Sequence, residues 1–328
     1  MLKKSSFRPA WWLKNRHLQT AFRNGPWGKL RRVGFRREQI ELPDGDFLHA
    51  DWTTGAGLPL TQPLVVVLHG LEGSSQSAYA TAIMTAIRDA GWQGVLMHFR
   101  GCSGEPNRLP RTYHAGDTGD IGFFLDLLAR RHPGLTIAAI GYSLGGNVLL
   151  KYLGENGANC TLATAIAVSV PFDLRIAADS IAKGMSRMYQ HALLQRMRAT
   201  LREKFTVENA PINLGRALAS RTFHEFDEYS TAPLHGFSGC EEYYRICSSL
   251  QYLKDINTPT LLLHASDDPF MTPEAVPDAD ELSDAVTLEL SEQGGHVGFI
   301  GGDVPLRPEY WLEPRIVAHL QEYLPGKA

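Results

Sequence analysis

The stretch Gly141–Gly145, with the sequence GYSLG, places the strongest constraint on how this chain can fold. An apolar run over residues 135–140 precedes it, and the apolar residues of 146–153 follow it. This order predicts a strand, a very tight turn and a helix, with Ser143 in strained backbone geometry at the apex of the turn. The flanking glycines allow the backbone to pack where any Cβ would clash. The alternative interpretation is a glycine-rich strand-to-helix turn that carries a solvent-exposed serine.

Apolar runs with strand character recur along the chain and alternate with segments of helical character. Further helices are predicted near 77–90 and 117–131, and an Asp-Gly turn predicts a hairpin over 37–52. The predicted core strands are 64–68, 94–99, 135–140, 163–170, 260–264 and 286–290. Strands and helices that alternate in this way predict an α/β fold with a mainly parallel sheet covered by helices on both faces.

Two segments depart from this alternation within what we interpret as a single domain, 1–328. Residues 172–250 have the pattern of helices without strands between them and are rich in apolar and aromatic side chains. We expect this insertion to form a helical lid over the carboxyl ends of the strands. Residues 1–36 show no clear periodicity, and we expect an irregular N-terminal arm whose aromatic side chains pack against the body.

Composition excludes several classes of function. A net charge of -3 gives no general attraction to nucleic acid or to an anionic membrane. The 4 cysteines are scattered and indicate neither a disulfide framework nor a zinc site. No signal peptide is visible, and no apolar run is long enough to cross a bilayer. We therefore expect a cytoplasmic protein without stable membrane insertion.

A serine hydroxyl becomes a nucleophile only beside a base, usually a histidine that a carboxylate orients. In the order serine, acid, histidine, the chain offers both partners directly after later strands, where open α/β sheets place their active sites. His296 lies in a loop with flanking glycines after the last strand and is the predicted base. Asp268 is the preferred acid because Pro269 closes the loop there. Asp267 is the alternative, and the other aspartate would cap the turn.

Acyl transfer also needs two backbone N–H groups that stabilise the developing oxyanion. The N–H of Leu144, directly after the serine, is one candidate. The N–H of Leu71, in the loop after the strand 64–68, is the other. The nearby His69 is expected to stabilise this loop rather than to act as a base.

Several motifs together resemble the α/β-hydrolase superfamily, and within it the YheT-like esterases, which are related to animal ABHD-type lipid hydrolases. The matching stretches are 15–20 (NRHLQT), 69–73 (HGLEG), 99–104 (FRGCSG), 111–114 (RTYH), 141–147 (GYSLGGN), 266–269 (SDDP) and 294–299 (GGHVGF). The resemblance implies a serine carboxylesterase or lipase-like hydrolase with Ser143, Asp268 and His296 as its triad and with no cofactor. No chemical role follows from the residues of 99–104, and Cys102 is expected to be part of a structural turn.

The predicted activity is hydrolysis of a carboxylic ester through an acyl-enzyme, with a small-molecule or lipid-like ester as substrate. An acyltransferase or thioesterase that uses the same triad is an alternative. A further alternative is a non-catalytic ligand-binding protein with a hydrolase scaffold. The apolar and aromatic composition of 172–250 suggests a hydrophobic acyl chain.

Overall fold

The run of β-branched and leucine residues at Leu64–Leu68 forms a central strand, β4, that is buried on both faces. Val65 and Val67 belong to one hydrophobic core. Leu64, Val66 and Leu68 belong to a second core on the opposite face. Successive side chains of a strand point to opposite faces, so a continuous apolar run of this kind requires a layer of helices on each side.

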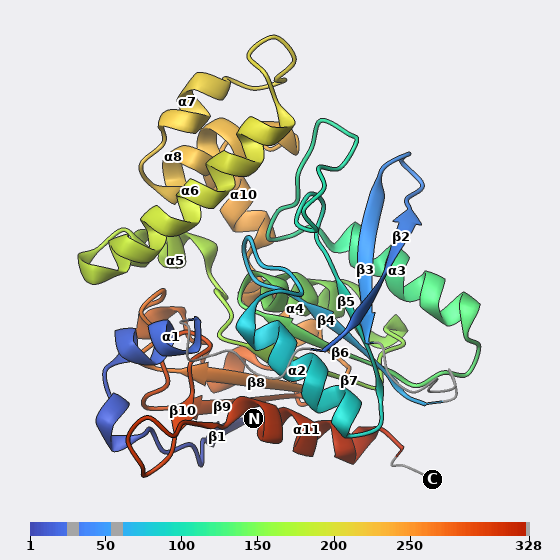
Figure 1. Cartoon of the computed structure of the whole chain (residues 1–328), viewed down its shortest axis with the longest axis vertical. Helices are drawn as coiled ribbons and strands as arrows, with labels where there is room; N and C mark the ends of the chain where they lie inside the picture. Colours follow the sequence, from blue (N-terminus) through green and yellow to red (C-terminus); the bar gives the residue numbers. More distant parts are fainter. Residues whose placement is uncertain (25–32, 54–61, 326–328) are drawn as a thin grey trace.

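The computed structural model describes residues 1–24, 33–53 and 62–325, and β4 lies within a 9-stranded sheet (Figure 1). The order across this sheet is β1-β9-β8-β7-β6-β4-β5-β3-β2. Its strands are β1 (Leu2–Lys4), β2 (Phe35–Glu41), β3 (Phe47–Thr53), β4, β5 (Gln93–Met97), β6 (Ile137–Tyr142), β7 (Thr164–Val168), β8 (Thr260–Ala265) and β9 (Val286–Ser291). In this order, every pair of neighbouring strands from β1 across the sheet to β5 is parallel. The remaining strand pairs are antiparallel, because β3 runs opposite to both β5 and β2. The predicted mainly parallel α/β fold is confirmed.

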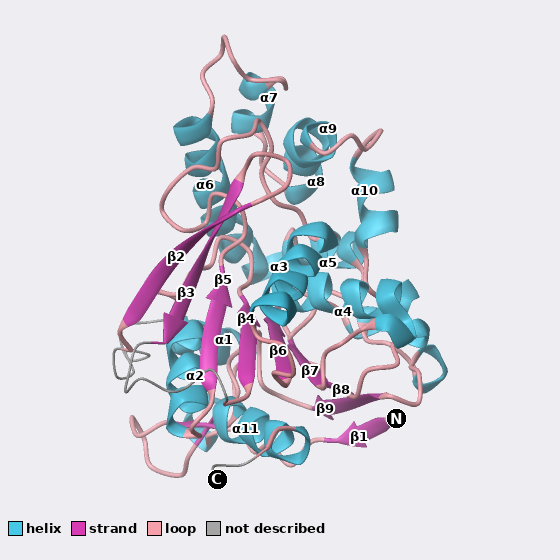
Figure 2. Ribbon diagram, turned by 90° about the vertical axis from the view of Figure 1, so that its right-hand side faces the viewer, coloured by secondary structure: helices cyan, strands magenta, loops and turns pink. Residues whose placement is uncertain are grey.

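Helices cover both faces of the sheet (Figure 2). One face packs on α2 (Ala78–Asp89) and α11 (Leu312–Tyr323), and the other packs on α3 (Thr118–Arg131) and α4 (Leu144–Asn156). A short antiparallel pair, β10 (Ile300–Gly301) with β11 (Glu309–Tyr310), follows the loop that carries His296. In the described residues, no helix is both long and apolar enough to span a bilayer.

The segment between β7 and β8 contains helices and no strand. These are α5 (Leu174–Ile181), α6 (Arg187–Lys204), α7 (Leu214–Ala219), α8 (Phe223–Phe226), α9 (Ala232–Leu234) and α10 (Cys240–Cys247), with a π-helical turn over Asp227–Thr231. Several of them form a separate helical layer at the upper end of Figure 1, with a small core of its own that includes Leu194, Leu201 and Phe226. We call this segment the helical insertion.

The expectation that the N-terminal arm is irregular is wrong for its described part. Residues 2–4 form β1, which pairs in parallel with β9 at the edge of the sheet. The side chains of β1 are exposed, so this strand leaves no apolar pattern in the sequence. Helix α1 (Arg16–Asn24) follows, and Asn15 Oδ1 accepts the backbone N–H groups of His17 and Leu18 at its start. Residues 25–32 of the predicted arm lie outside the described residues.

Candidate active site

Ser143 lies between β6 and α4 in a backbone conformation that few residues adopt. Its φ is 51° and its ψ is -119°. A Cβ on Gly141 would lie 2.5 Å from the carbonyl oxygen of Gly145, and a Cβ on Gly145 would lie 2.4 Å from the carbonyl oxygen of His69. Contacts this close to backbone atoms exclude any side chain, so the glycines are what permits the tight turn. The predicted strand, turn and helix are therefore present.

The imidazole of His296 lies between a hydroxyl and a carboxylate. Its Nε2 is 3.0 Å from Ser143 Oγ, and its Nδ1 is 2.8 Å from Asp268 Oδ2. Because an ionised carboxylate only accepts hydrogen bonds, Nδ1–H is the donor to Asp268, which leaves the Nε2 lone pair to face the serine hydroxyl. The ring of Phe270 stacks on the imidazole at a centroid distance of 4.0 Å. The structure thus brings together the three residues that the sequence selected.

The two adjacent aspartates have different partners. Asp268 is buried, and its other oxygen, Oδ1, accepts the backbone N–H of Phe270 at 2.8 Å. Asp267 Oδ1 instead accepts the backbone N–H of Gly295 at 2.9 Å, and burial raises the pKa of Asp267. Asp267 therefore fixes the glycine turn before His296, while Asp268 contacts the imidazole itself.

Helix α1 supports the loop that carries His296. Thr20 Oγ1 accepts the backbone N–H of His296 at 2.9 Å. The side-chain amide of Gln19 donates to the carbonyl of Ile300 and accepts its N–H, both within 2.9 Å. A Cβ on Gly295 would meet the carbonyl oxygen of Arg16 at 2.5 Å. The motif NRHLQT thus positions the histidine loop, a role that the sequence alone did not indicate.

The loop after β4 runs next to Ser143, since a Cβ on Gly70 would lie 3.3 Å from Ser143 Cβ. Leu144 is the first residue of α4, where a backbone N–H has no partner within an α-helix, and both Leu71 and Leu144 line the cavity that contains Ser143. Neighbouring contacts hold this loop. His69 Nε2 accepts the N–H of Phe99 at 3.1 Å, and Tyr79 accepts the N–H of Gly70 at 2.8 Å.

His69 is fully buried within this loop, and desolvation lowers the pKa of its imidazole to about 3. An imidazole that remains neutral and whose Nε2 accepts a backbone N–H can hold the loop, as expected, but is not free to take a proton from Ser143.

A mainly apolar cavity of about 130 Å³ opens from Ser143 toward the helical insertion. Its walls combine the core residues around Ser143 with side chains from α5, α6, α8 and α10. Apolar lining residues include Leu71, Leu144, Leu174, Ile181, Leu193, Met197, Leu201, Phe223, Phe226, Tyr243, Tyr244 and Phe270. A second, more polar groove of about 760 Å³ also contains Ser143, Leu193 and His296, and Arg196 lines it. Ser143 is therefore accessible from two spaces of different polarity.

Two acidic side chains in the cavity wall were not found from the sequence. Asp227 accepts hydrogen bonds from Tyr244 at 2.7 Å and Thr231 at 2.6 Å, and burial raises its pKa to about 6. Glu72 accepts hydrogen bonds from Tyr113 and Thr200, and burial raises its pKa as well. An acidic residue that folding buries has the same sequence signal as an exposed one.

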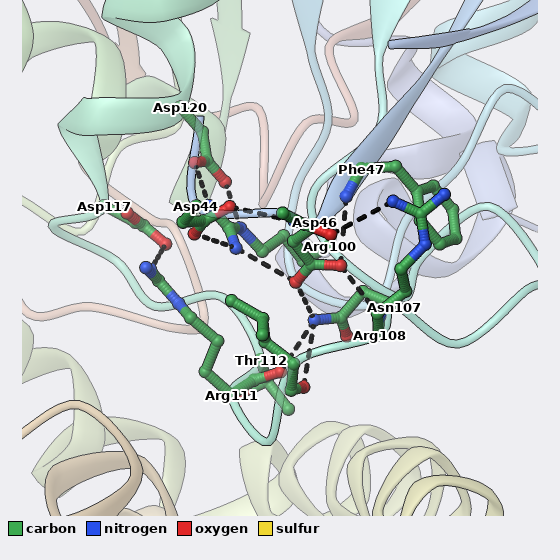
Figure 3. Close-up of polar contacts among 12 residues, drawn as sticks. Asp44, Asp46, Phe47, Arg100, Asn107, Arg108, Arg111, Thr112, Asp117 and Asp120 are labelled. Atoms are coloured by element: carbon green, nitrogen blue, oxygen red, sulfur yellow. Dashed lines mark hydrogen bonds and ion pairs between the residues drawn. The ribbon is translucent and has the colours of Figure 1, made fainter. Parts of the chain in front are cut away.

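The motif 99–104 forms a buried ionic network rather than a second reactive centre (Figure 3). Arg100 donates to both oxygens of Asp120, and its Nη1 donates to Asp44 and Asp46 in the β2–β3 turn. Asn107 Nδ2 also donates to Asp46, at 2.6 Å. The network connects the β2–β3 hairpin to β5 and α3. This connection gives Arg100 a structural role, which the sequence alone did not indicate.

The comparisons with known proteins agree with this geometry. The model of the "alpha/beta hydrolase fold" family matches residues 63–303. The chain belongs to this family. This α/β hydrolase is 43% identical over 328 residues to the "Putative esterase YheT" of Escherichia coli, covering 99% of the chain and 95% of that protein. It is 32% identical over 273 residues to the "Monoacylglycerol lipase" of Saccharomyces cerevisiae, covering 80% of the chain and 59% of that protein.

Among solved structures, the Pyrococcus furiosus esterase Pf2001 has the same fold as this α/β hydrolase. The TM-score is 0.56 at 16% sequence identity, over 89% of this chain and 94% of that one. At 16% sequence identity, the similarity between the two structures shows a shared fold only. The sequence relatives place the chain among hydrolases of the esterase and lipase kind.

Proposed function

We propose that this α/β hydrolase cleaves carboxylic esters through a covalent acyl-enzyme on Ser143. The observation that carries the proposal is the continuous chain of contacts from Ser143 Oγ to His296 and on to Asp268, at 3.0 Å and 2.8 Å. A hydroxyl that faces the Nε2 lone pair of a carboxylate-oriented imidazole is the arrangement that makes serine nucleophilic.

In the proposed reaction, Ser143 Oγ attacks the ester carbonyl while His296 Nε2 takes its proton. The N–H groups of Leu71 and Leu144 donate to the oxyanion of the tetrahedral intermediate. His296 then gives the proton to the leaving alcohol. Water enters next, loses a proton to His296, attacks the acyl carbonyl and releases the acid with regeneration of Ser143. Asp268 stabilises the imidazolium in both halves.

The two spaces at Ser143 suggest how an ester binds. We assign the acyl chain to the apolar cavity, since burial of each CH₂ group there contributes about 0.8 kcal/mol. The alcohol part then lies in the more polar groove. The helical insertion supplies much of the wall of the apolar cavity and acts as the lid in this proposal. The small size of the apolar cavity favours short and medium acyl chains.

The test uses a fluorophosphonate probe and p-nitrophenyl esters of increasing acyl length. Wild type is expected to react with one equivalent of probe, and Ser143→Ala is expected to lose the adduct and at least about 10⁴-fold in kcat. Ser180→Ala, a serine of α5 outside the cavity wall, is the matched control and is expected to retain both. A wild-type protein that forms no adduct would instead support a non-catalytic binding protein.

Product analysis with a competing alcohol separates hydrolysis from acyl transfer. We expect the free acid as the main product, because the groove beside Ser143 is open enough to admit water. A main product esterified with the competing alcohol, at equal total turnover, would identify an acyltransferase that uses the same serine.

A further inference from the structure

Three different metal-binding side chains meet within the helical insertion, away from the proposed triad. They are His224 of α8, and Cys240 and Glu241 at the start of α10. One donor atom from each lies within 4.8 Å of the other two. His224 Nδ1 is 3.6 Å from Cys240 Sγ and 4.0 Å from Glu241 Oε1. Cys240 is buried, and Glu241 leaves one side of the cluster open to solvent.

These separations are close to those of a tetrahedral zinc site. Bonds of about 2.3 Å to sulfur and about 2.0 Å to nitrogen, at a tetrahedral angle, place the two ligand atoms about 3.5 Å apart. The observed distance from Cys240 Sγ to His224 Nδ1, 3.6 Å, already matches this value. Two ligand atoms each about 2.0 Å from the metal are about 3.3 Å apart at the tetrahedral angle, so Glu241 Oε1, now 4.0 Å from His224 Nδ1, would approach by about 0.7 Å, which an exposed side chain can do by rotation.

The second ring nitrogen of His224 has the partner that a metal-bound histidine usually has. Its Nε2 lies 3.1 Å from Asp179 Oδ1 on α5. A carboxylate only accepts, so the tautomer with its proton on Nε2 fits the contact with Asp179, and in that tautomer the Nδ1 lone pair faces Cys240 and Glu241. A carboxylate on the outer nitrogen fixes the tautomer and orientation of a metal-bound imidazole.

A further carboxylate, that of Glu228, lies beside the cluster, where its Oε2 accepts the backbone N–H of Cys240 at 2.8 Å. On binding, a divalent metal ion would replace the thiol proton of Cys240, which leaves to solvent as the metal–sulfur bond forms. Arg175 pairs with the other oxygen of Glu241 at 3.1 Å and can orient this carboxylate without blocking Oε1.

We propose that His224, Cys240 and Glu241 bind one divalent transition-metal ion of the zinc type, with solvent as the fourth ligand and Asp179 as the orienting group. A mixed nitrogen, sulfur and oxygen set suits zinc and disfavours magnesium or calcium. The site goes beyond the proposed ester hydrolysis and does not depend on it. The scattered cysteines indicated no zinc site, because only folding brings Cys240 to a histidine 16 residues away.

The ion would join the helices that form the wall of the apolar cavity. His224 follows Phe223 on α8, and its ring packs edge-on against Tyr244 of α10 at 5.2 Å. Both Phe223 and Tyr244 line the cavity, as does Ala178, which precedes Asp179 on α5. A metal bond between α8 and α10, with α5 held through Asp179, would therefore stabilise the shape of that wall.

Cobalt(II) is the probe for the test, because a cobalt–thiolate bond gives a charge-transfer band that aqueous cobalt lacks. The metal-free full-length protein is titrated with Co²⁺, and then with Zn²⁺ against a chromophoric chelator. We expect one equivalent of Co²⁺ with a thiolate band, displaced by one equivalent of Zn²⁺. Cys240→Ser is expected to lose the band, Glu241→Gln to weaken Zn²⁺ binding at least tenfold, and Asp179→Asn to weaken it about 10-fold or more.

Cys160→Ser and His191→Gln are the matched controls, since neither residue belongs to the cluster. Both are expected to bind Co²⁺ as wild type does. Glu241 is exposed, so Glu241→Gln keeps the test valid if Cys240→Ser fails to fold. Zn²⁺ should also raise the Tm of wild type and leave that of Cys240→Ser unchanged. Absence of the thiolate band from wild type, or a band that persists in Cys240→Ser, would overturn the proposal.

Discussion

The sheet core and the helical insertion both contribute walls to the cavity at Ser143, but they hold their residues in different ways. In the core, backbone contacts at Gly141, Gly145 and Gly295 leave no room for a Cβ. In the insertion, buried polar side chains make the connections, as Asp227 does with Tyr244 and Thr231.

This difference has a functional consequence. Acyl transfer requires the nucleophile, base and oxyanion donors to remain within a fraction of an ångström of their working positions. Glycine-dependent backbone packing provides much of that rigidity, and at the loop of His296 it is supported by hydrogen bonds to Asp267 and Thr20. The wall of the apolar cavity, in contrast, has to match the shape of one acyl group. Single side-chain substitutions can change that shape. We therefore expect substitutions at the glycine-dependent contacts of the core to abolish folding or activity, and substitution of the buried Asp227 in the insertion to change stability in a pH-dependent way.

The largest effect is expected from Gly145→Ala. The added Cβ would lie 2.4 Å and 2.7 Å from the carbonyl oxygens of His69 and Leu68, and neither backbone atom can move without displacing β4. We expect loss of soluble folded protein, or destabilisation by several kcal/mol with no measurable esterase activity. Circular dichroism and thermal unfolding measure the first outcome, and p-nitrophenyl ester turnover measures the second.

Gly119→Ala is the matched control for the glycine substitution. Gly119 lies in α3, and a Cβ there would have no atom within 4 Å. Because alanine favours the helix over glycine by up to about 1 kcal/mol, this variant should be as stable as wild type or slightly more so. Equal thermal stability and equal esterase activity of Gly145→Ala and Gly119→Ala would show that the turn at Ser143 does not depend on glycine.

The next effect concerns Asp227 of the insertion. Burial raises its pKa from 3.8 to about 6, so between these values the folded chain binds more protons than the unfolded chain. The stability contributed by the protonated carboxyl is complete below pH 3.8 and is lost as the pH rises through about 6. At about 1.4 kcal/mol for each pH unit, the loss amounts to about 3 kcal/mol.

Asp227→Asn removes this titration while it keeps the shape of the side chain. Relative to wild type, the free energy of unfolding of the variant should therefore rise by up to about 3 kcal/mol between pH 4 and pH 7. Urea unfolding at both pH values measures the change, and Asp126→Asn on the exposed side of α3 is the control. Parallel pH profiles for wild type and Asp227→Asn would contradict a buried, titrating carboxyl.

A smaller effect is expected where the arm meets the core. Thr20→Val keeps the volume of the side chain but removes the acceptor of the His296 N–H, and an unpaired buried donor costs about 1–3 kcal/mol. The imidazole should shift, so we expect kcat to fall by about tenfold or more while KM changes little. Thr20→Ser, which retains the hydroxyl, should restore the rate. A loss that serine does not restore would point to packing instead.

The sequence predicts the parts of the site that have a local pattern. Ser143 and His296 follow strands and sit among glycines, so their positions can be read from neighbouring residues. The choice between Asp267 and Asp268 depends on which carboxylate faces a ring 28 residues away; the position of Pro269 favoured Asp268 but left Asp267 as an alternative. The supports from Gln19 and Thr20 and the burial of Asp227 are equally non-local. Strand β1 escaped prediction because only its backbone takes part in the sheet.

The smallest effect is expected at Cys102, a potential nucleophile of the core. Its thiol is packed against the core, and burial raises its pKa well above the ordinary value, so the reactive thiolate is scarce at neutral pH. Cys102→Ser should therefore change kcat/KM by less than about twofold, equivalent to about 0.4 kcal/mol. Ester turnover and probe labelling of the purified variant measure this. The opposite outcome would be a folded Cys102→Ser protein that loses ester turnover although the fluorophosphonate probe still labels Ser143. In that case the core would contain a second reactive group, and the contrast between a rigid core and a titratable insertion would fail.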